Sequence, residues 1–78
     1  MITEKNKYNE YQLKQIRFGL EDGLNVSFYA DPKFSWKQME QVRLGLEYGL
    51  AAWLYAKTKF SWKQMERKRK KMYVEQKL

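Results

Sequence analysis

The chain has 78 residues, with 16 Lys and Arg against 9 Asp and Glu, a formal net charge of +7, and neither Cys nor His. Without Cys there are no disulfides, thiolate nucleophiles or zinc and iron–sulfur sites of the usual kinds, and without His the commonest general base and metal ligand is missing. We therefore expect a non-enzymatic binding protein that uses no cofactor and no metal.

The length allows one small domain over residues 1–78. Hydrophobic residues make up 44% of the chain and aromatic residues 17%, too many for a disordered chain. Residues 1–7 lack the apolar segment of a signal peptide, and no apolar run approaches the roughly 18 residues that span a bilayer. We expect a folded cytoplasmic protein that does not use a membrane as its partner.

A tandem repeat with an offset of 26 residues is the strongest pattern in the sequence. The segment Phe34–Glu40 recurs unchanged as Phe60–Glu66. Residues 12–37 match residues 38–63 at 15 of 26 positions without a gap. A fixed period of this size is typical of repeat architectures. The predicted fold class is all-α, a short solenoid-like tandem repeat of a long and a short helix that ends in a long basic C-terminal helix.

Three long helices are predicted to begin near residues 9, 35 and 61. Ser35 and Ser61 are each followed three residues later by Gln, the spacing of a capping box, and Asn9 begins a degraded version of it. The chain then divides into an N-terminal lead (1–8), a degraded first repeat (9–34), a second repeat (35–60) and a divergent terminal helix (61–78).

The long helices have apolar residues at helical spacing. In the first helix these residues are Leu13, Ile16 and Leu20, which we expect on one buried face. The second helix repeats the pattern one period later with Met39, Val42 and Leu46.

A turn and a short helix are predicted after each of the first two long helices. Gly23 and Gly49 suit the left-handed position that ends a helix. Asn25 can cap a short helix over residues 26–30, and residues 51–57 take the same place in the second unit.

Glycine recurs inside the long helices, at Gly19 and Gly45. A helical glycine costs about 1 kcal/mol relative to alanine, so a repeated glycine indicates a repeated reason. One interpretation is a close crossing of helices within each unit. The other is a backbone surface that is kept open for a ligand.

Two aromatic residues are candidates for a protein interface. Trp53 replaces Ser27 of the first unit, so it is not part of the shared pattern, and Trp is enriched among interface hot spots. Tyr73 follows the basic segment of the last helix. The aromatic residues at repeated positions are instead expected in the core or between units.

The segment over residues 29–50 reads Tyr-Ala-Asp-Pro-Lys-Phe-Ser-Trp-Lys-Gln-Met-Glu-Gln-Val-Arg-Leu-Gly-Leu-Glu-Tyr-Gly-Leu. It resembles a tandem repeat of about this period in poorly characterised phage and mobile-element proteins of Gram-positive bacteria. The resemblance covers residues 11–66, with departures at Asn25 and Ala51, where an Asp is expected, and after Glu66. It implies a small binding protein in a bacterial host cell, for example an anti-CRISPR-like inhibitor of host defence.

The last predicted helix holds most of the net charge. Residues 67–78 contain six Lys and Arg against one Glu, whereas residues 1–66 contain ten against eight acidic residues. Such a cluster is typical of a site for phosphates or for an acidic partner surface. A solvated polar cap at the end of a repeat array is the other interpretation. The candidate binding residues are Arg67, Lys68, Arg69, Lys70, Lys71 and Lys77.

These features predict a small protein that engages nucleic acid or a nucleoprotein complex through its basic C-terminal helix. The alternative is a module for protein–protein interaction or oligomerisation that has no nucleic-acid role. For an oligomer, a two-fold homodimer is favoured over head-to-tail stacking, because the first and last helices differ in sequence.

Overall fold

The computed structural model describes residues 7–78, so most of the predicted N-terminal lead, and the segment without signal-peptide character, lie outside the described residues. Within residues 7–78 the chain is all-α, with no strand. The elements are α2 (Glu10–Glu21), the 3₁₀ helix η1 (Val26–Phe28), α3 (Trp36–Glu47), the 3₁₀ helix η2 (Ala52–Leu54) and α4 (Trp62–Lys77).

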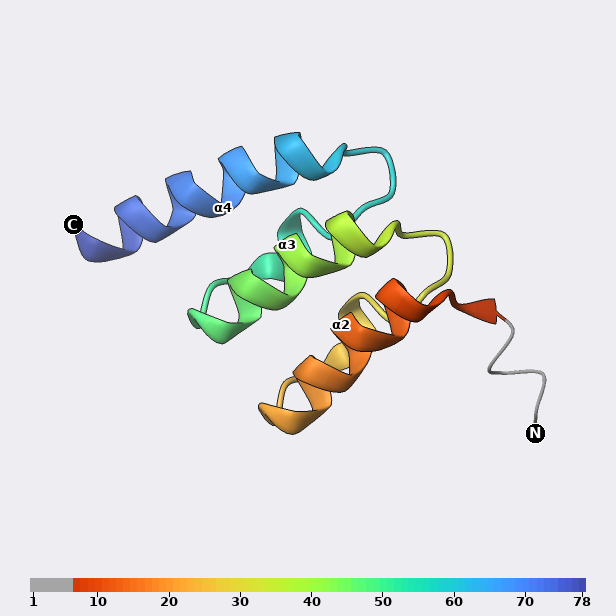
Figure 1. Cartoon of the computed structure of the whole chain (residues 1–78). Helices are drawn as coiled ribbons and strands as arrows, with labels where there is room; N and C mark the ends of the chain where they lie inside the picture. Colours follow the sequence, from red (N-terminus) through yellow and green to blue (C-terminus); the bar gives the residue numbers. More distant parts are fainter. Residues whose placement is uncertain (1–6) are drawn as a thin grey trace.

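The three long helices lie side by side and run in the same direction, with α3 between α2 and α4 (Figure 1). Each 3₁₀ helix packs against the long helix that precedes it, η1 against α2 and η2 against α3. The outer helices of the row are therefore α2 and α4 (Figure 1).

Each long helix begins at a complete capping box. At Ser35 and Ser61 the hydroxyl accepts a hydrogen bond from the backbone N–H of the Gln three residues later, at 3.1 Å. The same Gln side chain accepts from the serine N–H at 2.8 Å. Asn9 and Gln12 exchange the same two bonds at 2.8 Å each. The predicted helix starts are confirmed, and the first box, predicted as degraded, is complete.

α2 and α3 end in turns that require glycine. Gly23 and Gly49 both have φ of 73°, the left-handed region that other residues avoid. The N–H groups of Gly23 and the next residue donate back to the last turn of α2 at 3.1 and 2.9 Å, and the equivalent bonds after α3 measure 3.0 and 2.9 Å. α4 has Glu75 at the equivalent position and continues as a helix to Lys77.

The short helices predicted over residues 26–30 and 51–57 are wrong in length and type, because each is a single 3₁₀ turn of three residues. Asn25 caps the first of them as predicted, through its side chain. The buried Tyr29 and Tyr55 follow these turns directly. One tight turn is enough to bring each tyrosine back onto the preceding long helix, so the chain does not continue as a helix there.

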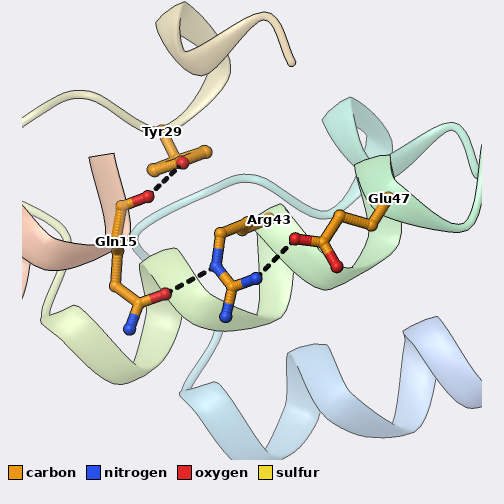
Figure 2. Close-up of polar contacts among 4 residues, drawn as sticks. All are labelled: Gln15, Tyr29, Arg43 and Glu47. Atoms are coloured by element: carbon orange, nitrogen blue, oxygen red, sulfur yellow. Dashed lines mark hydrogen bonds and ion pairs between the residues drawn. The ribbon is translucent and has the colours of Figure 1, made fainter. Parts of the chain in front are cut away.

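Tyr55 fills the space that Gly45 leaves in α3. Its Oη donates to the backbone oxygen of Gln41 at 2.6 Å. A Cβ at Gly45 would overlap this hydroxyl and come within 2.8 Å of the Cβ of Ala52. Tyr29 makes the equivalent contact with α2, which Figure 2 shows. The alternative of an open backbone surface is wrong, because the tyrosine occupies that space. Packing within each unit explains the glycine, as predicted, but the group that approaches it most closely is a tyrosine side chain.

The predicted buried face of the first helix is wrong at Leu20, which is 61% exposed. The buried positions of α2 include Gln12 and Gln15 instead. Both amides have partners that make burial favourable. The Nε2 of Gln12 donates to the backbone oxygen of Phe34 at 2.7 Å, and the Oε1 of Gln15 accepts from Nε of Arg43 at 2.8 Å. The face of α2 toward α3 is therefore polar and hydrogen-bonded.

In α3 the apolar prediction is confirmed at Met39 and Val42, which are buried, while Leu46 is half-buried against them. One cluster of buried residues extends from η1 to α4. Its members are Tyr29, Phe34, Met39, Val42, Ala52, Tyr55 and Met65.

Tyr29 and Tyr55 make the stability of the fold depend on pH in the alkaline range. Burial raises the pKa of both phenols from 10.0 to about 12. The unfolded chain therefore releases these protons first, so their contribution to stability is complete below pH 10 and is lost as the pH rises toward 12. We expect the urea midpoint to fall over this interval. Ultraviolet titration of the Tyr29→Phe/Tyr55→Phe variant should lack the late phenolate signal, and an unchanged titration curve would contradict the assignment.

Candidate nucleic-acid interface

α4 differs from α3 in charge more than in shape. It carries seven cationic side chains and two anionic ones, whereas α3 carries two of each. Four of the five extra cations occupy positions that hold glutamine, valine, leucine and glycine one period earlier, at residues 41, 42, 44 and 45, and the fifth is Lys77. Positive charge is thus concentrated on the last of the three helices.

One of the predicted binding residues, Arg69, faces the neighbouring helix. Its Nε donates to Oε1 of Gln41 at 3.0 Å, its Nη2 lies 4.0 Å from the carboxylate of Glu66, and only 12% of its side chain is exposed. Figure 2 shows the same arrangement one period earlier, where Arg43 donates to Gln15. The guanidinium of Arg69 therefore joins α4 to α3, whereas the neighbouring cations are exposed to solvent.

Five of the predicted residues are exposed. Four of them lie within residues 67–71, and we call these four the basic face: Arg67, Lys68, Lys70 and Lys71. Lys70 lies 3.6 Å from Glu66 while its side chain remains 66% exposed, and an ion pair of this kind contributes at most about 1 kcal/mol. Among residues 7–78 no ion pair involves Arg67, Lys68 or Lys71. The basic face is therefore largely unneutralised by residues 7–78.

Helical spacing determines how the basic face is arranged. Arg67, Lys70 and Lys71 are three and four residues apart and share one side of α4. Lys68 lies nearer to η2, and its Nζ is 4.6 Å from the ring centroid of Phe60. Lys77 is exposed further along the helix, with Nζ 5.2 Å from the ring of Tyr73. The cations thus cover a broad sector of α4.

An open groove of about 260 Å³ lies between α4 and η2. Lys68 and Lys71 contribute its cationic part, and Glu75 is its only acidic residue. The remaining lining residues are Leu54, Tyr55 and Met72. The sequence alone does not predict this groove. The one signal that pointed to it is Lys68, because this position is valine in the previous unit.

A second groove of about 370 Å³ lies on the other side of α4, lined by Tyr48, Arg69, Lys70, Tyr73 and Val74. The interface candidate Tyr73 thus belongs to this groove, with its ring 5.2 Å from that of Tyr48. The structure divides the basic face between two grooves, with Lys68 and Lys71 in the first and Lys70 in the second.

The other interface candidate, Trp53, is 49% exposed. Its ring stacks on that of Phe28, with centroids 5.5 Å apart and planes inclined by 30°. Trp53 directly precedes Leu54, which lines the first groove. The exposed aromatic pair therefore joins the two 3₁₀ helices, and one of its members is the chain neighbour of a groove residue.

Within residues 7–78, no helix has the length and apolar character that crossing a membrane requires, and no three residues of the types His, Cys, Asp and Glu gather where they could hold a metal ion. The resemblance to phage and mobile-element repeats stays a prediction. Neither a family model, nor a curated protein, nor a solved structure matches the chain.

Proposed function

We propose that this chain is a small non-enzymatic protein that binds nucleic acid through α4, with the side chains of the basic face contacting phosphates. The observation that carries the proposal is the exposure of four cations on one helix, three of them without an ion pair among the described residues. Exposed Lys and Arg clusters of this kind supply the salt-dependent affinity for the phosphate backbone.

The proposal includes the architecture, in which α2 with η1 and α3 with η2 are two tandem repeats and α4 is a divergent half-repeat. Equivalent contacts support it. Gln12 and Gln38 each donate to a backbone oxygen 22 residues later at 2.7 Å. Arg43 and Arg69 each donate to a glutamine 28 residues earlier, at 2.8 and 3.0 Å.

The substitutions in α4 disfavour a further repeat stacked in the same way. Gln15 and Gln41 each accept a hydrogen bond from the arginine of the next long helix, and the equivalent position in α4 is Arg67. The arginine of a further repeat would therefore meet a like charge at Arg67. Lys71 stands where Gly45 makes room for a tyrosine. These residues argue against head-to-tail self-stacking and leave the outer surface of α4 to a different partner.

A purely solubilising cap explains the basic face less well. Like charges three and four residues apart, such as Arg67 and Lys71, destabilise a helix by a few tenths of a kcal/mol per pair. Solubility needs only mixed charge, which carries no such cost. The presence of a cluster of cations despite this cost supports a role in binding.

The proposal is tested by fluorescence anisotropy with labelled 20-nucleotide single strands and a 20-base-pair duplex at low salt. We expect Lys68→Gln/Lys71→Gln to weaken binding about tenfold, because two phosphate contacts are lost. Lys14→Gln/Lys33→Gln removes the same charge from exposed sites elsewhere and should change the affinity less than threefold (about the effect of net charge alone). Absence of binding to every probe, or equal losses in the two variants, would refute the proposed function.

A further inference from the structure

We propose that the preferred ligand is single-stranded nucleic acid, with its backbone along Lys68 and Lys71 and a base stacked on Trp53. The inference rests on the proposed function and names the substrate class of the same site. It is carried by three features: the cations of α4, the groove between α4 and η2, and the exposed ring of Trp53, which stacks on Phe28 and precedes the groove residue Leu54 in η2.

The lining of the groove favours a ligand with unpaired bases. Leu54, Tyr55 and Met72 give it an apolar floor beside the two lysines. In a duplex the bases are stacked and paired, and the surface offered to such a site is mainly phosphate, so an apolar floor would contribute little. A single strand offers both a phosphate and a flat apolar face to the same site.

The size of the groove also favours a single-stranded ligand. Its volume of about 260 Å³ is below the range of about 300–1,000 Å³ that is usual for pockets enclosing a small molecule. The groove is also open to solvent. It therefore suits one flat group of a longer chain that continues outside the groove, as successive nucleotides of a strand do.

Trp53 supplies the stacking surface. Its contact with Phe28 holds the indole in place, while about half of the side chain stays exposed. Exposed aromatic rings beside a positively charged groove are the usual means of sequence-tolerant binding to single strands. The first unit has Ser27 at this position, so the ring occurs only in the unit that adjoins the basic helix.

The charged residues of the groove determine where the phosphates of the nucleic acid bind. The Nζ of Lys68 is held over the ring of Phe60 at 4.6 Å, and Lys71 lies about one turn further along the same groove. Glu75 repels phosphates at the far part of the lining. Phosphates are therefore placed on the side of Lys68 and Lys71, with the base directed toward η2.

The test compares a labelled 15-nucleotide oligothymidylate, a 15-base-pair duplex and a 15-residue oligoglutamate as probes of the full chain. We expect the single strand to bind more tightly than the other two. Trp53→Ala should weaken single-strand binding about tenfold, since stacking one base on an aromatic ring is lost, and should leave duplex binding unchanged. Trp53→Tyr, which keeps an aromatic face, should retain most of the affinity.

A spectroscopic readout separates stacking from a structural effect of the substitution. Oligothymidylate should quench tryptophan fluorescence in the wild type but not in Trp53→Ala, which keeps Trp36 and Trp62. Equal binding of single strand and duplex, with no effect of either substitution, would overturn this inference and leave the proposed function intact. Binding of oligoglutamate alone would overturn both and indicate an acidic protein partner.

Discussion

Gly45→Ala is expected to destabilise the fold by about 3 kcal/mol, although alanine normally stabilises a helix by about 1 kcal/mol relative to glycine. The new Cβ would overlap Oη of Tyr55 and lie 2.8 Å from Cβ of Ala52. The ring must then move, and the hydrogen bond to Gln41, worth about 1 kcal/mol, is lost with it. Urea unfolding followed by circular dichroism measures the change, which corresponds to a fall of about 15 °C in Tm for a domain of this size.

Two further variants show whether the tyrosine causes the effect. Gly45→Ala/Tyr55→Phe should be more stable than Gly45→Ala alone, because the overlapping hydroxyl is absent. Gly19→Ala should destabilise to a similar extent, since its Cβ would meet the hydroxyl of Tyr29 and lie 2.6 Å from Val26. A Gly45→Ala protein as stable as the wild type would show that Tyr55 does not pack into the glycine site.

Replacing all four residues of the basic face by glutamine is expected to lower the affinity for single-stranded nucleic acid about 100-fold or more at low salt. Stability should be unchanged or slightly higher, because the side chains are exposed, glutamine is a good helix former and like-charge repulsion disappears. Arg69 is left in place because it joins α4 to α3. Anisotropy titration and thermal unfolding of the same preparation measure both quantities.

The matched control removes one arginine and three lysines from exposed positions outside α4, through Lys7→Gln, Lys14→Gln, Arg17→Gln and Lys33→Gln. The two variants have the same net charge, so any difference in affinity reports where the charge lies. If the control loses as much affinity as the α4 variant, binding is non-local and the basic face is not the site.

Features that depend on neighbouring residues in the chain were predictable from the sequence. The capping boxes at Asn9, Ser35 and Ser61 and the left-handed turns at Gly23 and Gly49 are local, and each lies where its pattern places it. The length of the short helices was not predictable in this way. It depends on where Tyr29 and Tyr55 must reach on a helix 14 residues earlier.

Burial was harder to predict than helix limits. Leu20 is apolar but exposed. Gln12 and Gln15 are polar but buried, because residues more than 20 positions later in the chain provide hydrogen-bond partners for both amides. Periodicity of apolar residues cannot show this, since a buried amide is favourable only when its partner is known. The partners come from Phe34 and Arg43, which lie in another part of the chain.

The candidate site was partly visible in the sequence. The run of cations at residues 67–71 was evident. The separation of Arg69 from the exposed cations was not predicted, although the repeat indicates it. Arg69 aligns with Arg43 and Arg17 at offsets of 26 residues, whereas the residues around it break the pattern. A residue that keeps the repeat while its neighbours change has kept a structural contact. The groove required the structure, because Leu54 and Tyr55 meet Lys68 and Lys71 only in the folded chain.

The most direct test of the central claim is the dependence of oligothymidylate binding on salt for the wild type and the variant with four glutamines on the basic face. Each phosphate neutralised on a single strand contributes about −0.7 to the slope of log K against log salt, so the wild type should show a slope of about −3 and the variant a slope close to zero. Equal slopes in the two proteins would contradict the assignment of the basic face as the nucleic-acid interface.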